Sequence, residues 1–545
     1  MKKTIDLAAM PRKELEEYAK NASQEANRLQ QLLEGKEAEL RLLRQQRFGR
    51  KSEKRIREPE VEGQEQMCLF NEAEVLGEEE AEEPKAEKVL PRRSGKKKGR
   101  KEDVAKVLPK RTLTYVLGEE EAVCPQCNRP MATMKKVVRK EIEVIPAKVV
   151  VTEHITWHYV CRACEKTGVR TPIVHAASPK PLLRGSLLSP SMAAYLVMRK
   201  YENREPVHHV CKDLQSQGLA LTEATLCNWI LRTAEVYAKP LYQRMWETLL
   251  QCSYLQVDET PFQVLGEPGK SAASKSYMWV FCTNHTERPL VLYRYADTRS
   301  GKVLQEALGP YGGWLQCDGY DAYNALADAR RVGCFAHVRR KFHEAKAALD
   351  PKLPPQAREK EEEALERCDR LFALDREVKK LPEGRRLEWK KAHIQKEMEQ
   401  FFAWLKQQES RSGKESETFR KAIGYALHEQ PYLEQYLSDG RIELSNNLAE
   451  RSIRPFTIGR KNWMFCKSPR GAQASAIWYS IAITAKENGL LLFEYLRYVL
   501  EELRGVDPSS LSAEALDRLL PWSEQLPDCC FRKKQDMESE KTRTH

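Results

Sequence analysis

Residues 441–468 read RIELSNNLAERSIRPFTIGRKNWMFCKS, a basic segment around one acidic residue, Glu450, with a second acid, Glu443, near its edge. The nearest bases are Arg451, Arg454, Arg460 and Lys461. A carboxylate in such a charged, amide-rich segment is unsuited to a protein core. The pattern indicates that the acid holds a cation while the bases hold phosphates. Asn446 and Asn447, about one helical turn earlier, either cap a helix or contact the nucleic acid.

The composition of the chain favours a polyanionic partner. The net charge is +12 and the sequence pI is about 8.9, although a solvated basic surface would give the same balance. The 545 residues suffice for about three or four domains, and 41% of them are apolar. Without a run of about 18 apolar residues or a convincing secretion signal, neither a membrane span nor export is expected. The 15 cysteines, mostly scattered singly, indicate a reducing cytosol.

Residues 12–56 are predicted to form a coiled-coil helix followed by a basic arm. Apolar residues recur at alternating spacings of three and four, interrupted only by Lys36, as in a heptad pattern. They are Leu15, Ala19, Ala22, Ala26, Leu29, Leu33, Leu40 and Leu43. A coiled coil implies self-association into a homo-oligomer; an amphipathic helix packed on its own protein is the alternative. In the arm, Arg47, Arg50 and Lys51 are suited to binding phosphates.

A zinc-binding module is predicted over residues 111–180, after a charged, flexible linker at 57–110. Two C-x-x-C pairs joined by strand-like runs provide four thiolates for one tetrahedral zinc, as in a zinc ribbon. The ligands are Cys124, Cys127, Cys161 and Cys164. Redox pairs are the main alternative to zinc, and His154 and His158 are interpreted as ordinary strand residues rather than replacement ligands.

Residues 187–248 are predicted to be helical, with the spacing of a helix-turn-helix. The first helix ends near Gln217, Gly218 makes the turn, and Thr222 caps a second helix. A plain helical hairpin would give the same pattern. If the second helix enters a DNA groove, the groove-facing side chains are Thr225, Asn228 and Arg232.

From residue 252 the pattern changes to strands. Three apolar runs, SYLQVDETPFQVL, SYMWVFCTN and RPLVLYRY, are followed by helix, strand, helix and strand up to residue 349. This is the order of elements in an RNase H-like core, so the chain is predicted to be a multidomain α/β protein. Residues 350–437 are charged and helix-rich, and Pro382 separates them into a helical hairpin inserted in the core. The core then resumes at 438–488, before a C-terminal helical segment at 489–525 and a polar tail at 526–545.

Two further carboxylates are expected beside Glu450. Asp258 follows the strand SYLQV and Asp318 follows the strand GWLQC, and these strands are neighbours in an RNase H-like sheet. Glu450 would come from a helix against the same edge. Three converging carboxylates can bind two divalent cations, Mg²⁺ or Mn²⁺. Such ions activate an attacking water or hydroxyl and stabilise the leaving oxygen during attack on phosphorus.

Four residues near these acids are predicted to have structural or secondary roles. Glu259 should face away from Asp258, and Asp321 should cap the following helix. Cys334 and His337 have metal-like C-x-x-H spacing but no second pair, so we expect a strand-end thiol and a structural or DNA-facing imidazole. Two aromatic residues either stack on a flipped base or pack in a core strand: Trp463 and Phe465.

These features together resemble the IS66 family of bacterial insertion-sequence transposases, of the DDE class. The resemblance extends over nearly the whole chain through RFGRKSEK, the cysteine pairs, VDETP, CDGYDAY, GCFAHVRRKFHEA and, most specifically, SNNLAERSIRPFTIGRKNWMF. It implies that Asp258, Asp318 and Glu450 are the catalytic acids and that the four cysteines form the family's zinc module. It also implies binding of transposon ends, cleavage that frees a 3′-hydroxyl, and attack of that hydroxyl on target DNA.

The resemblance further implies partners that the residues alone do not reveal. Such enzymes act as oligomers, often with two small companion proteins encoded beside them, in the bacterial cytoplasm at the nucleoid. Two other functions would share some of these motifs. A zinc-containing DNA-binding regulator would need no set of three acids, and a nuclease with the same sheet would hydrolyse DNA without joining ends.

The four-cysteine interpretation predicts about one zinc ion per chain, because two knuckles complete one tetrahedral shell. Elemental analysis of protein purified without chelator measures this directly. A metal-free preparation would contradict the assignment of Cys124, Cys127, Cys161 and Cys164 as ligands.

Overall fold

The computed structural model describes residues 149–155, 158–160, 173–175, 179–283, 288–350, 354–410, 416–507 and 510–532. The predicted coiled coil, the basic arm with Arg47, Arg50 and Lys51, the linker and both cysteine pairs lie outside the described residues. Within the predicted zinc module, β1 (His158–Val160) and β2 (Ile173–His175) form an antiparallel pair. Among the described helices, none is long and apolar enough to cross a membrane.

Six helical segments precede the sheet in the described part of the chain. They are α5 (Pro190–Val197), η2 (Met198–Glu202), α6 (Val207–Ser216), α7 (Glu223–Thr233), η3 (Ala234–Ala238) and α8 (Lys239–Leu249). After α6, Gly218 takes a φ of +91°, which a residue without a side chain adopts at little cost. The Thr222 hydroxyl accepts the Thr225 N–H at 3.2 Å and caps α7. The predicted helix ends are confirmed, and DNA binding by this pair stays a prediction.

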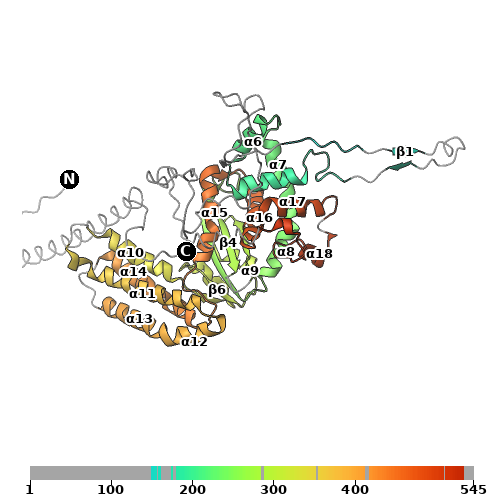
Figure 1. The fold of residues 1–545 in the computed structure, drawn as a ribbon. Helices are drawn as coiled ribbons and strands as arrows, with labels where there is room; N and C mark the ends of the chain where they lie inside the picture. Colours follow the sequence, from blue (N-terminus) through green and yellow to red (C-terminus); the bar gives the residue numbers. More distant parts are fainter. Residues whose placement is uncertain are drawn as a thin grey trace, which may run out of the picture. The chain divides into compact units, whose positions relative to one another are not determined.

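A mixed sheet forms the centre of the described chain, with strand order β5-β4-β3-β6-β7 (Figure 1). β3 (Tyr254–Val264), β4 (Lys275–Thr283) and β5 (Val291–Ala296) are antiparallel neighbours. β6 (Trp314–Gln316) and β7 (Arg330–Val332) continue the sheet parallel to β3. The connections are α9 (Gly301–Leu308) and η4 (Asp321–Ala325). The predicted succession of elements is therefore confirmed, with a 3₁₀ helix where the second connecting helix was expected.

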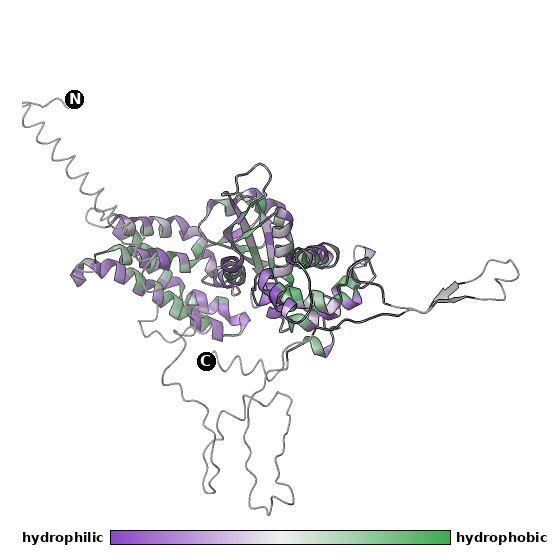
Figure 2. Ribbon diagram, turned by 90° about the horizontal axis from the view of Figure 1, so that it is seen from above, coloured by the Kyte–Doolittle hydropathy of each residue, from purple (hydrophilic) through white to green (hydrophobic). Residues whose placement is uncertain are grey.

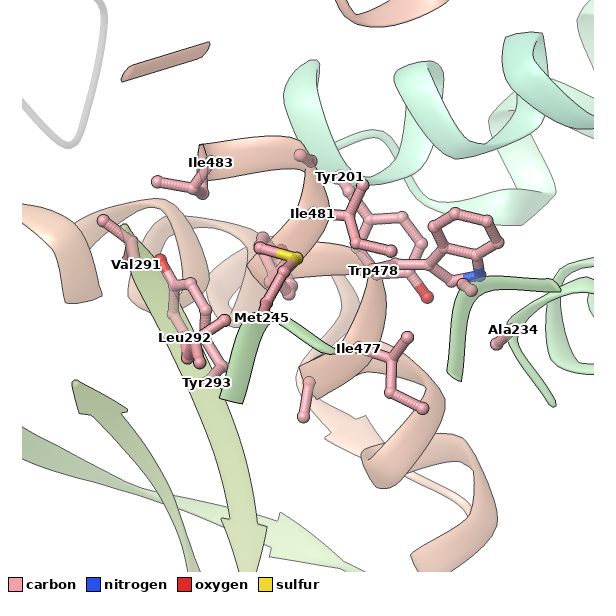
Figure 3. Packing of buried hydrophobic residues seen from close by; sticks show 14 of the residues in the cluster. Tyr201, Ala234, Met245, Val291, Leu292, Tyr293, Ile477, Trp478, Ile481 and Ile483 are labelled. Atoms are coloured by element: carbon pink, nitrogen blue, oxygen red, sulfur yellow. The ribbon is translucent and has the colours of Figure 1, made fainter. Parts of the chain in front are cut away.

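Helices from the end of the chain pack against the antiparallel strands. α15 (Asn447–Trp463) contacts β3 and β4, β8 (Phe465–Cys466) pairs with the far end of β3, and α16 (Pro469–Glu487) packs against β5. Figure 3 shows Tyr293 of β5 and Trp478 of α16 among the buried residues of the resulting core. Every residue of α16 from Ala474 to Ala485 is buried, which explains its near-continuous apolar sequence.

α16 also covers the outer edge of the sheet. The Val291 N–H donates to the Thr484 hydroxyl at 3.0 Å, and the same hydroxyl donates to the Val291 carbonyl at 2.9 Å. The Tyr293 N–H donates to the Ser480 hydroxyl at 2.8 Å. Side chains of a helix thus satisfy backbone groups that an edge strand otherwise exposes.

The predicted insertion is a helical layer packed against the sheet, rather than a single hairpin. It follows α10 (Phe335–Ala348) and contains η5 (Pro355–Arg358), α11 (Glu359–Lys380), α12 (Glu383–His393), α13 (Gln395–Ser410), α14 (Glu417–Leu433) and η6 (Glu434–Leu437). Figure 1 shows these helices grouped beside β6, and Figure 2 shows polar and apolar residues alternating along them. Their apolar faces share a core with Tyr254, Trp314 and Val332 of the sheet.

A buried ion pair ties this layer to the sheet. Arg331 of β7 donates to Glu429 of α14 at 2.7 Å, and both side chains are almost inaccessible to solvent. The same guanidinium donates to the Asp318 carbonyl at 3.0 Å and to the Asn324 side chain at 2.9 Å. The insertion therefore supports the backbone that carries Asp318.

The C-terminal helices are α17 (Leu492–Glu502), α18 (Ala513–Asp517) and η8 (Asp528–Cys530). The prediction of a polar tail from residue 526 is wrong for residues 526–532. Leu526 and Cys530 are buried, and the Leu491 N–H donates to the Cys530 carbonyl at 2.7 Å. This long-range contact had no local signal in the sequence.

Replacing Arg331 with methionine is expected to lower the free energy of unfolding by about 3–5 kcal/mol, because the Glu429 charge stays buried without its partner. Denaturant unfolding measures the loss. The double variant Arg331→Met/Glu429→Leu should recover most of it. A single variant as stable as the parent would contradict the role given to this pair.

Candidate active site

Asp258 and Asp318 occupy equivalent positions on neighbouring strands. Gln256 of β3 pairs in register with Gln316 of β6, and each aspartate comes two residues after its glutamine. Paired strands lie about 4.8 Å apart, so the two aspartates leave the parallel pairing side by side. One detail of the prediction is corrected: β3 does not end before Asp258 but continues, paired with β4, to Val264.

A buried amide network holds this region together. Gln256 and Gln316 are both 0% exposed, and the Gln256 side-chain amide donates to the Gln316 side-chain oxygen at 2.9 Å. Gln316 in turn donates to the carbonyls of Gly333 at 3.1 Å and Glu443 at 2.7 Å, and the Tyr254 hydroxyl donates to Gln316. The network joins β3 and β6 to the end of β7 and to the segment that leads into α15.

The first turn of α15 is fastened directly beside Asp258. Asn446 donates from its side-chain amide to the Val257 carbonyl at 2.9 Å, and the Ala449 N–H donates to the Gln256 side-chain oxygen at 3.3 Å. The Asn446 N–H also donates to the buried Cys334 thiol at 3.2 Å. Glu450, the next residue after Ala449, is thereby held near the two aspartates.

Like charges act on one another in this cluster. The pKa of Asp258 is raised well above its usual value, first by burial and then by the carboxylates of Glu259, Glu450 and Asp318. The sequence-predicted acids are thus within electrostatic range of one another. The negative charge concentrated here suits a bound cation.

Basic side chains already contact these acids. Arg340 of α10 donates to Glu450 at 3.1 Å, and His337 Nε2 lies 3.7 Å from the same carboxylate oxygen. Burial and the neighbouring Arg340 lower the pKa of His337. On the other side, Arg299 lies 3.7 Å from the Asp318 carboxylate.

Arg299, Arg340 and the role of His337 beside Glu450 were missed by the sequence reasoning. His337 and Arg340 are three residues apart in GCFAHVRRKFHEA, a spacing that places them on one face of a helix, so a signal existed for this pair. From the sequence, Glu259 is expected only to face away from Asp258. Its side chain is 1% exposed and accepts hydrogen bonds from Arg299 and Tyr323, so it anchors Arg299 beside Asp318.

The carboxylates of Asp258, Asp318 and Glu450 are chemically suited to a divalent cation, since carboxylate oxygens are the ligands that Mg²⁺ and Mn²⁺ prefer. Within the part of the chain that the structure describes, no three His, Cys, Asp or Glu side chains are arranged as a ready-made metal site. Burial first, and then the carboxylates of Glu259, Glu450 and Asp318, raise the pKa of Asp258.

The residues predicted to bind DNA are not equally accessible. Arg451, Arg454 and Lys461 are exposed along α15, and Asn447, its first residue, is partly exposed. Arg460 donates to the Thr260 hydroxyl at 3.1 Å and to the Pro261 carbonyl, so part of its guanidinium ties α15 to β3. Asn446 is not available for the predicted DNA contact, because its side chain is 1% exposed and donates a hydrogen bond inside the protein.

Comparison with known sequences identifies the class of protein. Residues 185–474 match the model described as "Transposase IS66 family", residues 121–165 match "zinc-finger binding domain of transposase IS66", and residues 37–112 match "Transposase C of IS166 homeodomain". All three describe parts of transposases, and the protein is a transposase. Since the first match covers more than half of the 545 residues, the chain belongs to the IS66 transposase family.

The chain is also similar to curated proteins of Sinorhizobium fredii. It is 28% identical over 436 residues to the uncharacterized protein y4jD, a match covering 76% of this chain and 81% of the relative. It is 28% identical over 433 residues to the uncharacterized protein y4qI, covering 74% and 75%. No solved structure matches the chain significantly.

Replacing Gln256 with leucine is expected to reduce the free energy of unfolding by roughly 2–3 kcal/mol, because buried partners lose their hydrogen bonds. DNA nicking should fall by about tenfold or more, because the start of α15 is no longer held in position. Chemical denaturation and a nicking assay measure the two effects. The matched control is Gln263→Leu, an exposed glutamine on the same strand, and equal effects in both variants would rule out the network's role.

Proposed function

We propose that this transposase is a DDE-class enzyme that cleaves DNA at transposon ends and joins the freed ends to target DNA. The catalytic acids are Asp258, Asp318 and Glu450. The observation that carries the proposal is the matched register of the two aspartates, together with the anchoring of α15 beside them through Asn446.

The proposal includes an RNase H-like core. Three antiparallel strands, β3 to β5, are followed by β6 and β7 parallel to β3, with β3 in the middle of the sheet. This succession supports the assignment, as does the position of both aspartates just beyond the pairing of β3 with β6. The helical insertion enters after β7 and α10 and returns before Glu450.

In the first reaction, a water oxygen bonds to the phosphorus at the transposon end, and the bond from phosphorus to the 3′ oxygen breaks. The products are a 3′-hydroxyl on the transposon and a 5′-phosphate on the flanking DNA. In the second reaction, that 3′-hydroxyl bonds to a target phosphorus and a target 3′ oxygen leaves. Both reactions are in-line displacements, so one set of residues can serve them in turn.

Asp258, Asp318 and Glu450 would hold the divalent cations, which when bound supply Lewis-acid activation of the attacking oxygen and charge neutralisation at the leaving oxygen. Arg340 and His337 orient the Glu450 carboxylate from α10, and Arg299 does the same for Asp318. Arg451, Arg454 and Lys461 face solvent along α15, where they bind phosphates close to the cleaved bond.

The remaining modules complete the proposal. The match over residues 121–165 includes all four predicted zinc ligands and supports a structural zinc ion at Cys124, Cys127, Cys161 and Cys164. The α6–α7 pair, the N-terminal basic arm with Arg47, Arg50 and Lys51, and Asn447 contribute further DNA contacts. The enzyme acts as a homo-oligomer in the bacterial cytoplasm at the nucleoid, with two small companion proteins. A DNA-binding regulator without catalysis would not need acids braced in this way.

Asp258→Asn and Glu450→Gln are each expected to lower metal-dependent nicking of the element's terminal repeats by at least about 100-fold, because each removes a negatively charged ligand. The substrate is the DNA that flanks the gene, with Mg²⁺ or Mn²⁺ present. Asp321→Asn is the matched control, since Asp321 is exposed and three residues after Asp318, and should nick normally.

Two results would contradict this assignment in different ways. If the two acid variants nick as well as the parent, the catalytic residues are wrong. If the parent hydrolyses the ends but never joins them to a second DNA, the protein is a nuclease that shares the sheet rather than a DDE transposase.

A further inference from the structure

The end of α15 exposes two large apolar side chains next to each other. Met464 is 69% exposed and Phe465 is 46% exposed, and Leu265, from the turn that β8 contacts, is 38% exposed. Single apolar residues on a surface need no explanation, but adjacent ones beside a cluster of bases mark an interaction surface. The bases are Arg460, Lys461 and Lys467.

The backbone at Met464 is strained and held firmly. Its φ of 63° and ψ of −52° lie in a region that residues with side chains rarely adopt. The Met464 N–H donates to the Arg460 carbonyl at 2.6 Å. Immediately after it, Phe465 and Cys466 pair with Gln263 and Val264 of β3.

The following residues are fixed as well. The Leu265 N–H donates to the Cys466 carbonyl and the Gly266 N–H to the Lys467 carbonyl, both at 2.9 Å. A side chain at Gly266 would come within 2.8 Å of the Lys467 carbonyl oxygen, so this close approach requires glycine. The Ser468 hydroxyl then caps α16. The two apolar side chains are therefore presented on a rigid turn rather than a loose loop.

The position of this turn relative to the acids follows from helix geometry. Spacings of three and four place one stripe of residues on a single face of α15. The stripe is Asn447, Glu450, Arg454, Thr457 and Lys461, and Met464 follows directly after the last residue of the helix. At about 1.5 Å per residue, Met464 lies about 21 Å along the axis from Glu450. That distance corresponds to about six base pairs of duplex DNA.

The sequence left open whether Trp463 and Phe465 stack on a base or pack in the protein, and the two residues differ. Trp463 is the last residue of α15 and packs edge-on against Phe456 with ring centroids 5.4 Å apart. Phe465 is exposed beside Met464. The surface available to a partner is therefore Met464 with Phe465.

We propose that Met464 and Phe465 form an apolar wedge that inserts into the base stack of the transposon-end DNA, about six base pairs from the cleaved bond. The proposal rests on the proposed function, because it needs α15 to lie along the DNA with Glu450 at the cleavage site. The exposed bases between the two points favour DNA over an apolar protein surface, since Arg454 and Lys461 lie on the same stripe and complement phosphates.

The test uses the full chain and duplexes of the element's terminal repeat, with 2-aminopurine placed at successive positions from the cleaved bond. Binding by the parent is expected to raise the fluorescence several-fold at one position, about six base pairs away, because the base unstacks there. The variant Met464→Ala/Phe465→Ala should bind the duplex but lose this increase. Leu187→Ala, which removes an apolar side chain that is 85% exposed elsewhere, should keep it.

The wedge is wrong if the parent binds the duplex without raising the 2-aminopurine fluorescence at any position. It is equally wrong if the double variant raises the fluorescence as much as the parent does. It is also wrong if the double variant leaves the fluorescence intact and changes only the oligomeric state in sedimentation, since the patch is then a contact between copies. Asp258→Asn protein should still brighten the same position. If the parent cleaves the DNA but does not raise the fluorescence, only the wedge is refuted. If the parent raises the fluorescence but shows no metal-dependent cleavage, only the proposed catalysis is refuted.

Discussion

The hydrogen bond between the buried side chains of Gln256 and Gln316 is the constraint on which the candidate site depends. Each glutamine uses both ends of its amide, so the pair reaches two strands, the end of β7 and the segment before α15 at once. Unsatisfied amides in such an interior are costly, which makes the arrangement specific as well as stable. Because the aspartates come two residues later on each strand, the register of the glutamines is also the register of the acids.

The helical insertion has a structural role that its sequence concealed. It contributes no acid to the site, yet Arg331 and Glu429 connect it to the backbone of Asp318. The Gly333 N–H, one residue beyond β7, donates to the Tyr432 carbonyl of α14 at 3.0 Å, which joins the end of this strand to the insertion. An interruption of more than eighty residues between two acids is tolerated because it packs against the strand that precedes it.

Much of this could be predicted where the signal is local. The strands, the turn at Gly218 and the cap at Thr222 follow from neighbouring residues, and the strand order places Asp258 beside Asp318. Contacts between distant segments could not be predicted. Asn446 looked like a surface amide because burial leaves no mark on a single polar residue, and Arg299 and Arg340 reach acids encoded far away. The sequence predicts two helices in the insertion where the structure has four, because only one break, at Pro382, carries a proline.

The hydroxyls of Thr484 and Ser480, which α16 places against the backbone of the edge strand β5, have a consequence for assembly. Because α16 closes this edge, a second molecule cannot add a strand beside β5 without displacing these hydrogen bonds. If the proposed homo-oligomer forms at the transposon ends, strand addition at β5 is therefore not available as a subunit contact. The same closure protects a highly charged protein from the edge-to-edge stacking that leads to fibrils.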